Sequence, residues 1–240
     1  MLARTTEAPV LLIGAAHVVD LADPLRRVLS GRPLDGIAVE LDPERAATLF
    51  DPPEHRGRST GAPLFARLWA IVQRRLGAEI GGGPPGSEMR AAAVYAREQG
   101  LPLFLIDDPL RATLGELVRR MPLRERVSLL ASAFVGLVLP ARVVEREMDR
   151  YAESPTEYAE ELRQASPTIA RVLLDDRNEH MAERLAVLRQ RGYGRIAAVV
   201  GDAHVPGLKA ALGRRGVPSE AVTFRELRRT PATVPGPRPS

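Results

Sequence analysis

The chain contains 240 residues, of which 45% are hydrophobic and 27% are charged, and this composition suits one globular domain with a sizeable core. The absence of cysteine excludes disulfides, zinc–thiolate sites and cysteine nucleophiles, so a metal would have to be held by His, Asp or Glu. The formal net charge is only +4 and the arginine doublets are scattered along the chain, so we expect no nucleic-acid binding.

The first predicted element is a buried strand that begins at Val10 and leads into the sequence Gly14-Ala15-Ala16-His17. A short helix is predicted over residues 20–29 and a second strand over residues 37–42. Two strands joined by a helix within about thirty residues imply parallel pairing with a right-handed crossover.

The middle of the chain alternates predicted helices with irregular segments. Residues 43–50 and 64–76 have helical spacing, whereas the polar residues 51–61 predict an exposed loop and the Gly/Pro-rich residues 81–86 a flexible rim. Ser87 is expected to cap a helix over residues 88–99. A third buried strand is predicted over residues 101–106, directly before Asp107.

The second half begins with a helical excursion over about residues 110–165, which shows helical periodicity and no convincing strand. Asp175 and Asp176 are expected to cap a helix over residues 177–191. A strand over residues 196–200 then leads into Gly201-Asp202-Ala203-His204, a near-copy of the first Gly-x-x-His motif. A helix over residues 208–212 and a last strand over residues 221–224 complete the predicted elements.

These elements predict an α/β fold with a mostly parallel central sheet flanked by helices, in one domain over residues 1–229, followed by a disordered tail over residues 230–240. The longest apolar window, residues 127–144, is interrupted by polar residues and is shorter than the roughly 20 residues that a bilayer requires. The first apolar run is too short for a signal peptide. We therefore expect a cytoplasmic protein without a membrane segment.

Four predicted strands end in a residue that is able to do chemistry: His17, Glu40, Asp107 and His204. The carboxyl ends of parallel strands share one edge of the sheet, which is where ligands bind in open α/β folds. Two neutral imidazoles and a carboxylate can hold a catalytic metal and leave a position open for water. We therefore predict His17, Glu40 and His204 as metal ligands, with Asp42 in reserve.

The residue types do not decide which metal is bound or whether the site needs a metal at all. Without a thiolate, zinc, manganese and cobalt are all chemically acceptable. A metal-free alternative uses the same residues, with a histidine and Glu40 as general acid and base. Dinucleotide binding is disfavoured because the first motif lacks the second and third glycines of that fingerprint and places His17 where a pyrophosphate would approach.

Further candidates lie at predicted helix starts. Glu88 would either complement a helix dipole or serve the site. Arg177 and Asn178 lie where an arginine opposes the dipole, so we expect Arg177 to clamp a carboxylate or an oxyanion. His180 and His55 are interpreted as ordinary surface residues.

The ordered set of motifs resembles the TraB family of pheromone-shutdown proteins, which is similar to the Tiki metallopeptidases and, more distantly, to erythromycin esterase and ChaN-like proteins. The resemblance covers about residues 9–212, and it rests on the two Gly-x-x-His motifs and on four stretches between them: Val39-Glu40-Leu41-Asp42 with Arg45, Gly86-Ser87-Glu88-Met89-Arg90-Ala91-Ala92, Leu105-Ile106-Asp107, and Arg177-Asn178-Glu179-His180-Met181-Ala182.

This resemblance implies a site with His17, Glu40 and His204 at its core and Glu88, Arg177 and Asn178 as supporting residues. It also implies a metal-dependent hydrolase that acts on a peptide or another amide. The alternative is a non-catalytic protein that binds a peptide in the same cleft. In either case the helical excursion is expected to cover the site or to form a homodimer surface.

Overall fold

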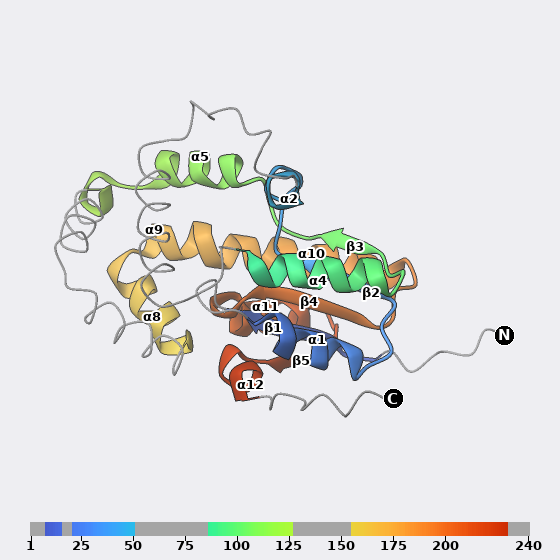
Figure 1. Ribbon diagram of the computed structural model, residues 1–240. Helices are drawn as coiled ribbons and strands as arrows, with labels where there is room; N and C mark the ends of the chain where they lie inside the picture. The colour runs from blue at the N-terminus through green and yellow to red at the C-terminus, as the bar shows by residue number, and fades with distance from the viewer. Residues whose placement is uncertain (1–7, 16–20, 51–85, 127–154, 230–240) are drawn as a thin grey trace, which may run out of the picture.

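The computed structural model describes residues 8–15, 21–50, 86–126 and 155–229. Its centre is a sheet of five parallel strands in the order β3-β2-β4-β1-β5 (Figure 1). The strands are β1 (Val10–Ala15), β2 (Gly36–Val39), β3 (Leu103–Leu105), β4 (Ile196–Gly201) and β5 (Ser219–Val222). The predicted α/β class with a mostly parallel sheet is therefore confirmed.

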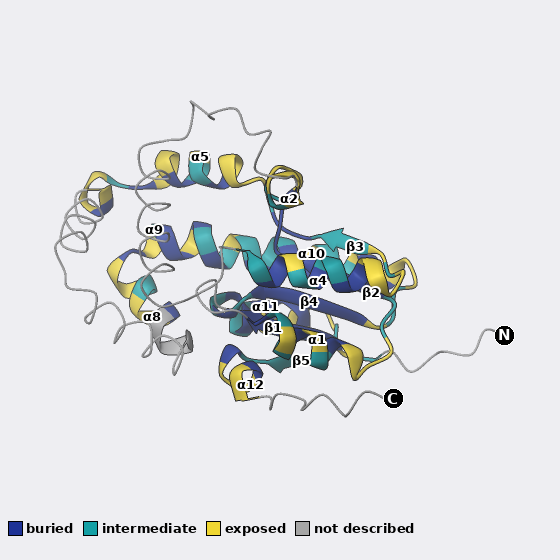
Figure 2. Cartoon of the chain, in the orientation of Figure 1, coloured by how far each residue is buried: buried dark blue, intermediate teal, exposed yellow. Residues whose placement is uncertain are grey.

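Strands β1 to β4 are apolar along their whole length because helices cover both faces of the sheet, whereas the edge strand β5 begins with Ser219 and Glu220 (Figures 1 and 2). In β1, Leu11 and Ile13 face one core, whereas Val10 and Leu12 face the other. The first core is closed by α1 (Ala22–Ser30), α4 (Ser87–Glu98) and α12 (Phe224–Arg229). The second is closed by α10 (Asp176–Gln190) and α11 (Val205–Arg214).

Strand β2 ends at Val39, three residues earlier than predicted, because the next side chains serve other contacts. The backbone N–H groups of Glu44 and Arg45 donate to Asp42 Oδ1 at 2.8 and 3.0 Å, so Asp42 caps helix α2 (Pro43–Phe50). The chain thus leaves the sheet with Glu40 and Asp42 at its carboxyl edge.

Between β3 and α10 the chain is helical where the structure describes it, in agreement with the predicted excursion. It contains α5 (Leu110–Arg120), α8 (Pro155–Ala165), α9 (Pro167–Ala170) and the π-helical turn η2 (Arg171–Asp175). Buried Leu117 and Met121 pack against Ile169 and Val172 in a small third core, which joins α5 to α9 and η2. No helix within these described ranges is long and apolar enough to cross a membrane.

The predicted cap at Asp175 and Asp176 is wrong, because α9, η2 and α10 form one continuous helix. Asp175 has helical backbone angles and binds Arg163, with Nη2 2.7 Å from Oδ1. The start of this long helix is bound instead by buried Glu125, whose carboxylate accepts from the N–H and the hydroxyl of Thr168 at 3.2 and 3.0 Å.

The predicted cap at Ser87 is also wrong, because Ser87 is the first residue of α4 and makes no capping hydrogen bond. The preceding Gly86 occupies the cap position with φ of +87°, a left-handed conformation that glycine adopts without strain. The predictions for residues 51–61, 64–76, 81–85 and 230–240 lie outside the described residues. The single domain over residues 1–229 stays a prediction.

Candidate functional site

Three of the four predicted strand-end residues lie on neighbouring strands at one edge of the sheet. Glu40 follows β2, Asp107 follows β3 and His204 follows β4, and the order β3-β2-β4 places these strands side by side. All three side chains are buried. The fourth residue, His17, lies outside the described residues.

Both oxygens of Glu40 have defined partners. Oε2 accepts a hydrogen bond from the backbone N–H of Gly201 at 2.6 Å, a contact that the pairing of β2 with β4 makes available. Oε1 is paired with Arg177 Nη2 and lies 3.4 Å from His204 Nε2. Glu40 therefore bridges the end of β4, helix α10 and the second Gly-x-x-His motif.

The other ring nitrogen of His204 is held by Asn178. His204 ends the short 3-10 turn η3 (Asp202–His204), and its Nδ1 lies 2.9 Å from Asn178 Oδ1. Because an amide oxygen only accepts, Nδ1 donates its proton to Asn178, and in a neutral imidazole Nε2 would then turn its lone pair toward Glu40. Two acceptors then face each other, an arrangement that favours a proton or a metal cation between them.

Arg177 and Arg45 lie on either side of Asp107. Arg177 donates through Nε to Asp107 Oδ1 at 3.0 Å and through Nη2 to Oδ2 at 2.5 Å. Arg45 Nη2 binds the same Oδ2, and Arg45 Nε donates to Asp42 Oδ2 at 2.7 Å. The charges alternate from Asp42 through Arg45, Asp107 and Arg177 to Glu40, and we call these five residues the ionic chain.

The ionic chain favours the charged forms of Arg177 and Asp42. Burial alone would lower the pKa of Arg177, but the charges and hydrogen bonds of Glu40 and Asp107 outweigh it and hold this pKa above its ordinary value. Burial raises the pKa of Asp42, but the hydrogen bonds from the Arg45 backbone and guanidinium exceed this effect, so the pKa of Asp42 lies below its ordinary value.

The reason given for suspecting Arg177 was wrong, although the residue does clamp carboxylates. Arg177 does not begin a helix, because the π-helical turn η2 precedes it without a break. Its Nη1 donates to the carbonyl oxygen of Leu173 within that turn at 3.2 Å. π-Helical turns are rare and are often found at functional sites.

Sequence reasoning missed Asp202, a buried carboxyl group inside the second motif. Its Oδ1 accepts from the backbone N–H of Phe224 at 2.8 Å, which ties the end of β4 to the start of α12. The same carboxyl group packs against Gly14 of the first motif, where an added Cβ would lie 2.0 Å from Oδ1. The acidic residue directly after the second motif's glycine was the available signal.

Gly14→Ala is expected to lower the free energy of unfolding by about 1–3 kcal/mol, the usual cost of overpacking. The new methyl would collide with Asp202 Oδ1, which the hydrogen bond from Phe224 holds in place. Urea denaturation of Gly14→Ala, Asp202→Ala and the double variant measures the coupling between the two sites. We expect the double variant to lose less stability than the two single losses together, and strict additivity would contradict this contact.

The stability of the protein is also expected to depend on Asp202 through pH. Burial raises the pKa of Asp202, only partly offset by the Phe224 N–H, and the charge of Glu226 raises it further. The stability that the protonated group contributes is therefore complete below the unfolded-state pKa, about 3.9, and is lost as the pH rises through the folded-state pKa. Asp202→Asn should abolish this loss, so its stability relative to the wild type should increase across that pH window. Urea denaturation between pH 3.5 and 7 measures it, and a constant difference would contradict the prediction.

Comparison with known proteins shows which family has this sequence pattern. The TraB/PrgY/gumN family matches residues 2–218. The chain belongs to this family. It is also 32% identical over 211 residues to an uncharacterized protein of Methanocaldococcus jannaschii, a match that covers 84% of this chain and 53% of that protein. The chain thus spans about half the length of this curated relative.

A metal site in this TraB/PrgY/gumN protein is compatible with the geometry of Glu40 and His204. Two ligands at about 2.0–2.1 Å from one tetrahedral ion lie about 3.3 Å apart, and Oε1 and Nε2 are separated by 3.4 Å. The hydrogen bond from Nδ1 to Asn178 is the kind of contact that orients a metal-binding imidazole. Within the described ranges no three His, Asp or Glu residues form a ligand cluster, and the third predicted ligand, His17, is outside them.

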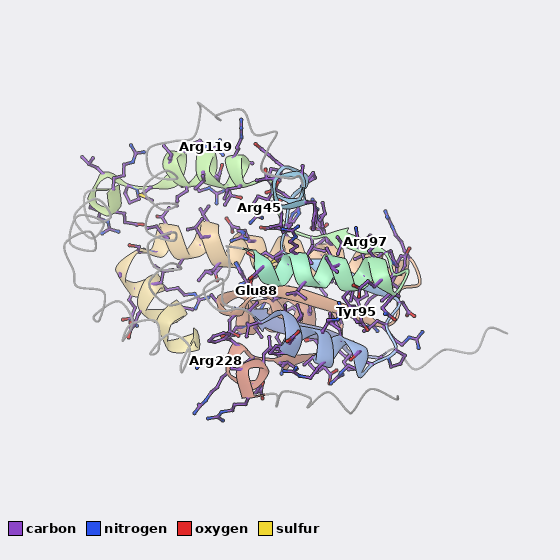
Figure 3. All side chains as sticks on the ribbon, in the orientation of Figure 1. Arg45, Glu88, Tyr95, Arg97, Arg119 and Arg228 are labelled. Atoms are coloured by element: carbon purple, nitrogen blue, oxygen red, sulfur yellow. The ribbon has the colours of Figure 1, made fainter. Side chains whose placement is uncertain are left out.

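Glu88 is the remaining site candidate among the described residues. It is not part of the ionic chain, and none of the hydrogen bonds given above joins it to His204. It is fully buried in the first turn of α4, and Ser87 Oγ lies 3.5 Å from its Oε2. Figure 3 shows Glu88 at the end of α4 that lies toward the carboxyl edge of the sheet. This place suits the helix dipole and leaves its role in the site a prediction.

Proposed function

We propose that this TraB/PrgY/gumN protein is a metal-dependent hydrolase acting on a peptide or another amide bond. Glu40, His204 and His17 would hold one divalent ion, for which zinc, manganese and cobalt are the candidates. The observation that carries the proposal is the 3.4 Å separation of Glu40 Oε1 and His204 Nε2, with the ring oriented by Asn178. Two acceptors at this spacing suit a shared cation.

Each described residue then has a defined task. Arg177 orients Glu40, and Asn178 keeps the proton of His204 on Nδ1. A bound divalent ion would supply an activated water at neutral pH and polarise the amide carbonyl. Hydrolysis breaks the C–N bond, and water provides the oxygen for the carbonyl carbon and a proton for the departing amine. Arg177 uses Nε and Nη2 for protein carboxylates and one N–H of Nη1 for the Leu173 carbonyl oxygen, so the second N–H of Nη1 would meet a developing oxyanion.

The same contact also supports a metal-free reaction. A proton on Nε2 would make His204 and Glu40 a buried imidazolium–carboxylate pair, and this pair can exchange a proton with a substrate as general acid and base. The metal content of the protein separates the two mechanisms.

The deciding experiment is elemental analysis of protein purified without chelators or a histidine tag. We expect near-stoichiometric metal in the wild type, loss of the metal in His17→Ala/His204→Ala, and retention in His180→Ala. His180 is the matched control because it lies one helical turn beyond Arg177 and pairs with Asp108, 3.0 Å away. Absence of metal from the wild type, even after incubation with manganese, cobalt and zinc, would favour the metal-free mechanism.

Turnover is tested on a pool of short N-acetylated peptides, with products detected by mass spectrometry. Products that require the metal and disappear in His204→Ala would support the hydrolase. Binding that persists after metal removal, without any product, would instead favour the non-catalytic peptide-binding protein.

We also propose that the helical excursion forms a homodimer surface. In its described part, Leu110 and Val118 of α5 are exposed by 44% and 58%, and Leu123 is exposed by 75%. Light scattering of the wild type and of Val118→Glu tests this proposal, and a monomeric wild type would contradict it.

A further inference from the structure

Arg45 in α2 is held rigidly along one edge of its guanidinium group. Nε donates to Asp42 Oδ2 at 2.7 Å and Nη2 binds Asp107 Oδ2. Both aspartates are buried, with 1% of each side chain exposed. Asp42 is fixed in turn by the backbone N–H groups of Glu44 and Leu110, at 2.8 and 3.2 Å. The orientation of the guanidinium plane is therefore set by the protein.

The Nη1 nitrogen of the same group takes no part in these contacts. An arginine has five N–H donors, and those on Nη1 have no acceptor in the part of the chain that the structure describes. The Arg45 side chain as a whole is 29% exposed. Donors on a guanidinium group that is already held in place cost little conformational entropy to engage, so Nη1 is well suited to bind an acceptor oxygen.

Arg45 lies close to the candidate reaction centre. Its Nη2 shares Asp107 Oδ2 with Arg177, and Arg177 Nη2 binds the Glu40 oxygen that faces His204. Three contacts in series therefore connect Arg45 Nη2 to Glu40 Oε1, so their separation is at most about two residues of an extended peptide. Figure 3 shows Arg45 beside α2, at the same end of the sheet as Glu88.

We infer that Arg45 determines specificity by binding a free carboxylate of the substrate through Nη1, an inference that rests on the proposed function. In a peptide this is the C-terminal carboxylate, one or two residues beyond the cleaved bond. The N–H donors of Nη1 carry part of the guanidinium charge, so they form charge-assisted hydrogen bonds to a carboxylate oxygen. The ionic chain already contains three carboxylates against two guanidinium groups, so a singly charged carboxylate is repelled less than a doubly charged phosphate.

The test compares two probes, N-acetyl-trialanine with a free carboxylate and the same peptide as its C-terminal amide. Their affinities for the purified protein are measured by calorimetry. The wild type should bind the acid at least about tenfold more tightly than the amide, the value of one charge-assisted hydrogen bond. Arg45→Met should remove this preference, and Arg45→Lys should keep only part of it because lysine lacks the planar fork.

Arg97→Met is the matched control, since Arg97 is an exposed arginine at the opposite end of α4 from the site (Figure 3). It should keep the wild-type preference. Thermal unfolding of each variant shows whether it is folded. If Arg45→Met does not fold, the acid-over-amide preference of Arg45→Lys tests the inference instead. Equal affinity for acid and amide, or no binding of either, would overturn the inference.

Mass spectrometry of the same samples separates this inference from the proposed function. Cleavage of both probes without a preference in binding would leave the hydrolase standing and refute the role of Arg45. A preference that depends on Arg45, without cleavage under any metal, would refute the hydrolase and support the carboxylate site.

Discussion

Replacing Arg177 with methionine is expected to lower the free energy of unfolding by about 3–5 kcal/mol, the typical cost of removing one partner from a buried ion pair. Methionine fills a similar volume but leaves Glu40 and Asp107, which are 7% and 1% exposed, without the guanidinium between them. Urea denaturation at pH 7 measures the loss. The same variant should also weaken metal binding, since Glu40 loses the contact that orients it.

Arg184→Met provides the control for this substitution. Arg184 lies on the same helix and donates to the carbonyl oxygen of Leu105 at 3.0 Å, so its loss removes a hydrogen bond without stranding a carboxylate. We expect a cost of about 1 kcal/mol there. Adding Asp107→Asn to Arg177→Met should recover part of the lost stability. Equal costs for Arg177→Met and Arg184→Met would show that the ionic chain is not a buried charge system.

The second large effect is expected for Gly207→Ala, which should weaken metal binding about 10- to 100-fold, the usual result of removing a contact that orients a ligand. A Cβ at Gly207 would lie 2.1 Å from Asn178 Nδ2, so the amide must move away. Asn178 then no longer accepts from His204 Nδ1, and the orientation of the imidazole is lost. Metal affinity is measured by competition with a chromophoric chelator.

Gly213→Ala is the control for this substitution. Gly213 lies on the same helix as Gly207, α11, and no atom lies within 4 Å of the Cβ that alanine adds. It should leave metal affinity unchanged and stabilise the protein by about 0.4–1 kcal/mol, because alanine restricts the unfolded chain. Unchanged affinity in Gly207→Ala would contradict the role of Asn178.

The sheet and its carboxyl edge could be predicted because their signals are local. Continuous apolar runs mark β1 and β4, and a glycine followed by a histidine three positions on marks each strand end. The parallel pairing of strands then brings Glu40, Asp107 and His204 to one edge without further information. The family resemblance added Asn178, which the structure places against His204.

The ionic chain could not be predicted because its contacts join distant parts of the sequence. Arg45 is 62 residues from Asp107, and Asp107 is 70 residues from Arg177. The π-helical turn was missed for a different reason, since it differs from an α-helix by a single residue of register and leaves no trace in hydrophobic spacing. The predicted cap at Asp175 and Asp176 was wrong because the helix begins earlier, where Glu125 from a distant part of the sequence binds its first turn.

The position of β4 constrains the order in which the protein can fold. β1 and β2 do not pair with each other, because β4 lies between them and pairs with both. During synthesis on the ribosome, β1 and β2 therefore cannot pair with β4 until residues 196–201 have left the exit tunnel. Such long sequence separations slow folding, and they make the joining of β1 to β2 through β4 and the arrival of His204 a single late event.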